Sequence, residues 1–139
     1  IAQLRKLPQI VKMQRNNSHK IWNYISDLGC VQKRPEPEKS YSTSDALVLI
    51  TERKEHASKI RKSLLSNGIS TKILPEAITW HFAGLWEHIP SLQNAHKYKI
   101  RDYLKFSEEI LSRSVSLPIS VRQSEHFPEK VRKAIVDIM

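Results

Sequence analysis

Residues 45–74 read DALVLITERKEHASKIRKSLLSNGISTKIL and carry a regular alternation of apolar and polar segments. The run from Asp45 to Thr51 is short and apolar on both faces, which predicts a central strand of a sheet. Thr51 is expected to cap a helix that follows it. One side of that helix is apolar and is formed by Ala57, Ile60, Leu64 and Leu65.

The second half of this stretch predicts another strand. Asn67 and Gly68 are expected to close the helix, because glycine adopts the left-handed conformation at low cost. Residues Ile69 to Leu74 then read as a strand, which Pro75 stops. A strand, a helix and a strand with short connections favour a right-handed crossover within one sheet.

The amino-terminal part of the chain predicts one long helix from Ile10 to Leu28, followed by Gly29 as its carboxy-terminal cap. Pro8 is expected at the front of this helix, where a missing N–H costs little, and the residues before it could form a separate turn. The helical face is formed by Ile10, Met13, Ile21, Tyr24, Ile25 and Leu28.

Three further elements are predicted in the second half of the chain. A helix is expected from about Ile100 to Leu111, and a half-buried strand from Val115 to Val121, which lies at an edge or ends at Pro118. Pro128 opens a last helix, whose apolar face is Phe127, Val131, Ala134, Ile135 and Ile138. The predicted fold class is α+β: a long N-terminal helix and a small sheet of three or four strands with helices on one side.

The composition of the 139 residues excludes several functions. Hydrophobic residues make up 40% and charged residues 27%, which is typical of a globular domain. With three glycines, no glycine-rich phosphate loop can be written. Cys30 is the single cysteine, which rules out an internal disulfide or a zinc ribbon and favours a reducing, cytoplasmic location; we expect a buried structural thiol. The longest apolar run, residues 46–50, is too short to span a bilayer.

The net charge of +9 raises the question of an anionic partner. The basic residues are scattered rather than gathered into one stripe with interleaved aromatic rings, so solvated helix faces are the simplest interpretation. An anionic substrate or a partner surface would also suit this charge. A basic nucleic-acid-binding module and a protein-interaction module are the alternative functions, although no nucleic-acid or membrane partner is expected.

Residues 78–88 read ITWHFAGLWEH and combine two tryptophans, one phenylalanine and two histidines. These rings could simply cap the sheet, or they could form the wall of a pocket in which imidazole supplies a polar tip and the rings offer flat surface to a sugar. His81 and His88 are about two helical turns apart, which is too far for one metal ion, so no metal site is expected. No catalytic set can be assembled from the chain itself.

Three separated segments resemble the DegT/DnrJ/EryC1/StrS aminotransferases. Residues 2–11, AQLRKLPQIV, are similar to the family segment that joins the large domain to the small one, with Gln3, Leu4, Arg5, Lys6, Leu7 and Ile10 matching. Leu65, Gly68, Ile69 and Thr71 are in register with a family helix-to-strand passage, and residues 116–119, SLPI, resemble the strand before the final helix. The three matches occur in the family's order and cover nearly the whole chain.

The resemblance implies a fold-type-I enzyme that uses pyridoxal 5'-phosphate to move an amino group from glutamate or glutamine onto a keto-sugar in surface-polysaccharide or antibiotic-sugar biosynthesis. The chain would be its C-terminal small domain, with residues 1–29 as the linking helix and 30–139 as an α+β sandwich. The Schiff-base lysine would lie upstream, so this part alone would be inactive and would bind no cofactor. His81 and Phe82, with Trp80 beside them, would contact the sugar, and the parent enzyme would be a cytoplasmic homodimer.

Overall fold

The computed structural model describes residues 2–72, 78, 82–86, 89–90 and 100–139, with the backbone alone for residues 2 and 3. Three strands form one sheet in the order β1 (Val31–Lys33), β2 (Ala46–Thr51) and β3 (Ser114–Pro118). Both strand pairs are antiparallel, with Val31 opposite Thr51 and Leu47 opposite Leu117. The predicted fold class and the central position of β2 are confirmed.

The second strand of the predicted crossover is represented by Lys72, which forms an antiparallel bridge with Ser116 of β3. Because β3 is itself antiparallel to β2, the chain at Lys72 runs in the same direction as β2, with β3 between them. Residues 69–71 are irregular, and the remaining two residues of the predicted strand lie outside the described part of the chain.

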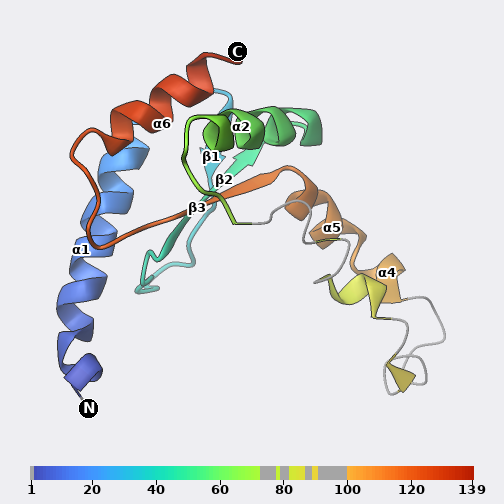
Figure 1. The fold of residues 1–139 in the computed structure, drawn as a ribbon. Helices are drawn as coiled ribbons and strands as arrows, with labels where there is room; N and C mark the ends of the chain where they lie inside the picture. The colour runs from blue at the N-terminus through green and yellow to red at the C-terminus, as the bar shows by residue number, and fades with distance from the viewer. Residues whose placement is uncertain (1, 73–77, 79–81, 87–88, 91–99) are drawn as a thin grey trace.

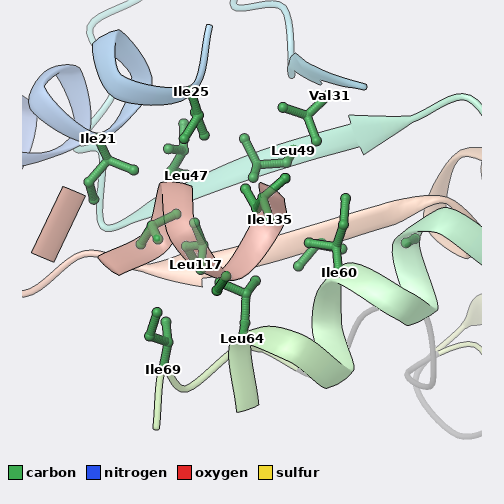
Figure 2. Close-up of a cluster of buried hydrophobic side chains, with 14 of the residues drawn as sticks. Ile21, Ile25, Val31, Leu47, Leu49, Ile60, Leu64, Ile69, Leu117 and Ile135 are labelled. Atoms are coloured by element: carbon green, nitrogen blue, oxygen red, sulfur yellow. The ribbon is translucent and has the colours of Figure 1, made fainter. Parts of the chain in front are cut away.

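Three helices cover one face of the sheet (Figure 1): α1 (Ala2–Ile25), α2 (Lys54–Ser66) and α6 (Phe127–Val136). The core lies between them and the sheet, where the inward side chains of β2 and β3 meet Ile21, Ile25, Ile60, Leu64 and Ile135 (Figure 2). Strand β2 alternates, so Leu47, Leu49 and Thr51 are buried while Ala46, Val48 and Ile50 are only half-buried. The prediction that β2 is apolar on both faces holds for its composition, but the helices bury only one of them.

Helix α1 is longer than predicted, because it begins at Ala2 and includes Pro8 in its interior. Pro8 lacks the N–H that would donate to the carbonyl of Leu4. Leu4 is 71% exposed, so this carbonyl lies in an exposed turn of the helix. The helix ends at Ile25, three residues before the predicted end at Leu28. Gly29 has a positive φ of 66°, but it lies four residues beyond the end of the helix and so does not cap it as predicted.

The buried face of α1 also differs from the predicted one. Val11, Ser18, Ile21 and Ile25 are buried, at intervals of seven, three and four residues. Met13 is 38% exposed and Tyr24 is 49% exposed, so both lie outside this stripe. A helix can bury only a narrow stripe against one neighbouring layer, and apolar residues beside that stripe remain in solvent.

Helix α2 begins without the predicted threonine cap. Its N-cap residue is Arg53, which makes no side-chain capping bond, and the Thr51 hydroxyl lies 2.7 Å from the Arg53 carbonyl instead. Leu65, predicted on the buried side, is 43% exposed. The carboxy-terminal cap is confirmed: Gly68 has a φ of 67°, and the N–H groups of Gly68 and Ile69 donate to the carbonyls of Leu65 and Leu64.

The predicted helix at residues 100–111 is divided into α4 (Ile100–Tyr103) and α5 (Lys105–Ser112). Strand β3 stops at Pro118, as the missing donor of proline predicts, and Pro128 lies in the first turn of α6. Ser114 and Ser116 are buried rather than half-exposed, and the Ser114 hydroxyl donates to the Ile110 carbonyl at 2.6 Å. Within the described residues, no helix is both long enough and apolar enough to cross a membrane.

Candidate functional site

The aromatic segment is described only in part. Trp80, His81 and His88 lie outside the described residues, whereas Phe82 begins a short 3-10 turn, η2 (Ala83–Leu85). Two backbone bonds close this turn, from the Leu85 N–H to the Phe82 carbonyl at 3.0 Å and from the Trp86 N–H to the Ala83 carbonyl at 3.1 Å. The turn therefore has a defined geometry, and it begins at Phe82, one of the three residues predicted to contact the sugar.

Phe82 is 6% exposed, and its ring lies against Gly84 of its own turn. A Cβ atom on Gly84 would lie 2.3 Å from Cε1 of the ring, which real atoms cannot tolerate. Gly84 has no positive φ in this structure, so its role is space for the ring rather than an unusual backbone conformation. The ring of Phe82 thus anchors the turn, while Trp86 remains 38% exposed.

The aromatic turn is η2 together with Phe82 and Trp86 on either side of it. Helix α4 packs against η2, so the segment that leads into β3 supports this turn. The supporting helix is held by an ion pair in which the Arg101 guanidinium donates to both carboxylate oxygens of Glu108. This contact lowers the pKa of Glu108, because the charged carboxylate is the form that accepts these bonds. Phe82 was identified as a candidate residue from the sequence, but Gly84 was not. The feature that could have indicated Gly84 is its position two residues after an aromatic residue.

The described lysines do not fit the site of a pyridoxal phosphate Schiff base. Such a lysine is shielded from water so that its amine is reactive. All described lysines are exposed except Lys33, which is half-buried and pairs with Glu36 at 3.3 Å. No chemical step through the cofactor can therefore be assigned to the described part of this chain.

Two further kinds of reactive group could support catalysis in the described residues, a thiol and a metal-binding cluster. Cys30 is half-buried rather than fully buried, and burial raises the pKa of its thiol, which keeps it protonated at neutral pH. The residues that the structure describes contain no group of three His, Cys, Asp or Glu side chains that could hold a metal ion.

No family model matches the sequence. Solved structures do match the fold over nearly the whole chain. Spr1654 of Streptococcus pneumoniae, described as a sugar aminotransferase, is 12% identical over 99% of this chain with a TM-score of 0.68. A DegT/DnrJ/EryC1/StrS aminotransferase from Brucella abortus is 17% identical over 98% with a TM-score of 0.66. The E. coli GDP-4-keto-6-deoxy-D-mannose-3-dehydratase is 17% identical over 97% with a TM-score of 0.62.

The chain spans about a third of the length of each of these three proteins, at 33% of each chain. The predicted resemblance is therefore confirmed for the fold: the described residues share the architecture of one portion of sugar aminotransferases of the DegT/DnrJ/EryC1/StrS type. The same fold occurs in a dehydratase, so the architecture is common to at least two reactions on keto-sugars.

Proposed function

We propose that this chain is the C-terminal small-domain part of a pyridoxal-phosphate-dependent enzyme that acts on keto-sugars, and that its reaction is transamination. The observation that carries the proposal is the match of almost the entire chain to one third of such enzymes. Three sequence segments that resemble the same family, in the same order, support it independently of the fold.

In this proposal residues 1–29 are the linking helix and residues 30–139 are the small domain. Two properties of α1 support this division. Leu4 and Leu7, in its first turns, are 71% and 48% exposed, which suits a segment that leaves the domain. Ile21 and Ile25, in its last turns, are fully buried in the core of the domain.

The proposed substrates are a keto-sugar, either nucleotide-linked or a sugar acid, and glutamate or glutamine as the amino donor. When bound, pyridoxal phosphate would supply the electron sink for proton and amino-group transfer. His81, Phe82 and Trp80 would line the sugar side of the pocket. The contact of Phe82 with Gly84 would set the direction in which the preceding residues leave the turn. We further propose a cytoplasmic homodimer.

The experiment uses the complete gene product, incubated with a panel of nucleotide-linked keto-sugars and either glutamate or glutamine. Mass spectrometry of the product is expected to show replacement of the keto oxygen by an amino group. If the product has instead lost water, the reaction is that of a dehydratase and not a transamination. Pure protein that neither retains the cofactor nor converts any keto-sugar would refute the proposal.

A further inference from the structure

A recess of about 630 Å³ lies where the start of β1, the end of β2 and the first turns of α2 meet, and no residue of η2 lines it. This volume is within the range of about 300–1,000 Å³ of small-molecule sites. Part of its wall is aliphatic and is supplied by Leu28, Ile50, Ile60 and Ile138. The rest of the wall carries charges of both signs, which is unusual for a gap left by imperfect packing.

The basic residues in the lining of the recess are Lys59 of α2, Arg113 and His56. Arg113 is fixed, because its Nη1 donates to the Thr51 carbonyl at 3.0 Å. Its Nε is buried and has no hydrogen-bond partner; the closest acid, Glu109, places Oε1 3.6 Å away. That distance makes an ion pair but not a hydrogen bond, so the guanidinium keeps an unfilled donor.

Glu52 and Glu109 also line the recess, and Glu109 is the acid that pairs with Arg113. The lining therefore carries two carboxylates together with the two cations, and the formal charge of these four groups is zero. A bound phosphate would be repelled by both carboxylates, and a bound simple amine would be repelled by both cations. Within the lining residues no phenylalanine, tyrosine or tryptophan ring is present on which a sugar or a nucleobase could stack.

The ligand that satisfies all three features has a carboxylate, an ammonium group and an aliphatic side chain. We propose that this recess binds a free aliphatic α-amino acid, with its carboxylate on the Arg113 and Lys59 side, its ammonium on the Glu109 and Glu52 side, and its side chain on the aliphatic wall. The amino end of α2, which no side chain caps, adds positive potential for the carboxylate. This site is separate from the proposed sugar chemistry and does not depend on it.

The test is a titration of the protein followed by ¹H–¹⁵N NMR, with L-leucine as the probe. Leucine is compared with isocaproate, which lacks the amino group, and with isoamylamine, which lacks the carboxylate. Leucine is expected to shift the amide signals of Gly29, Cys30 and His56, and each analogue is expected to bind at least about tenfold more weakly, since each loses one charge-assisted contact. No shift with leucine up to about 10 mM, or equal binding of all three compounds, would overturn the proposal.

Variants sharpen the result. Lys59→Met is expected to weaken leucine binding about tenfold, whereas the matched Lys62→Met, which removes the same charge from the same helix outside this recess, should leave it within about twofold. Glu109→Gln should weaken leucine but not isocaproate, and so abolish the preference for the zwitterion. Equal losses in the two lysine variants, or an unchanged preference in Glu109→Gln, would show that the recess is not the binding site.

Discussion

Thr51 and Arg113 are joined by contacts in both directions at the point where β2 ends and β3 is about to begin. The Thr51 N–H donates to the Arg113 carbonyl at 2.9 Å, and the Arg113 Nη1 donates back to the Thr51 carbonyl at 3.0 Å. The Thr51 hydroxyl lies 3.1 Å from the same Arg113 carbonyl and 2.7 Å from that of Arg53. This pair explains why Thr51 does not cap α2: its side chain is already engaged at the end of the sheet.

Replacing the Thr51 hydroxyl should therefore destabilise the fold. Thr51 is 2% exposed, and Thr51→Val removes the hydroxyl that donates to the Arg53 carbonyl, at an expected cost of about 1–3 kcal/mol in the free energy of unfolding. The matched control is Thr71→Val, because the Thr71 hydroxyl is buried and has no hydrogen-bond partner. Thr71→Val is expected to be neutral or slightly stabilising. Urea unfolding of both variants measures the difference, and equal costs would argue against the role assigned to Thr51.

Gly84→Ala tests the contact beneath the aromatic turn. The added methyl group would lie 2.3 Å from the Phe82 ring, so the ring or the turn must shift, at a cost of about 1–3 kcal/mol. Hydrogen exchange of the Leu85 and Trp86 amides, which close the turn, should accelerate. Adding Phe82→Ala to Gly84→Ala should remove most of the extra cost. If the two substitutions are simply additive, Phe82 does not lie on Gly84.

The salt bridge between Asp27, which follows the end of α1, and Arg132 of α6 predicts a pH dependence. Arg132 donates to both carboxylate oxygens of Asp27, at 2.5 Å and 2.9 Å, and this hydrogen bonding lowers the pKa of Asp27. Because the folded-state pKa is the lower one, the stabilisation is fully present above the unfolded value of about 4 and is lost as the pH falls through the folded value. NMR titration of the Asp27 carboxyl should give a higher pKa in Arg132→Met. In Lys133→Met, which changes the neighbouring residue, the pKa should stay low; an unchanged value in Arg132→Met would contradict the pairing.

The buried stripe of α1 can be tested by two alanine substitutions on the same helix. Ile21 is fully buried, so Ile21→Ala should cost about 2–5 kcal/mol in the free energy of unfolding. Tyr24, at 49% exposure, should tolerate alanine at a cost of less than about 1 kcal/mol. Equal costs at the two positions would instead favour the wider face predicted from the sequence, which included both Ile21 and Tyr24.

His81→Ala tests the proposed sugar contact in the complete enzyme. The expected effect is a rise of about tenfold in the KM for the keto-sugar, because one hydrogen bond to the sugar is lost. The half-reaction with the amino donor should keep its rate. His126→Ala, at an exposed histidine before α6, is the matched control and should change neither quantity. A loss of rate in the donor half-reaction would remove His81 from the sugar side.

The sequence predicted the elements that depend on local chemistry. Gly68 ends α2 because only a residue tolerant of positive φ fits there, and Pro118 ends β3 because proline cannot donate to the ladder. Features that depend on contacts with neighbouring elements were less predictable. The register of the buried stripe on α1 and the engagement of Thr51 are decided by where α6 and Arg113 lie, which periodicity alone does not contain.

The candidate site was predictable to a smaller extent. An aromatic cluster stands out in any sequence, but the close approach of the Phe82 ring to Gly84 is a property of the folded turn. The charged recess was not predicted at all, since its residues come from four separated segments and share no motif. Trp80 and His81 remain predictions from resemblance.

The most direct test of the proposed division of labour is chemical trapping of the cofactor. The complete gene product, loaded with pyridoxal phosphate and reduced with borohydride, should carry the pyridoxyl label on one lysine, which peptide mapping locates. We expect that lysine outside residues 1–139, and we expect residues 1–139 expressed alone to take up no specific label. A label on a lysine of this chain, or no label on the complete protein, would contradict the account.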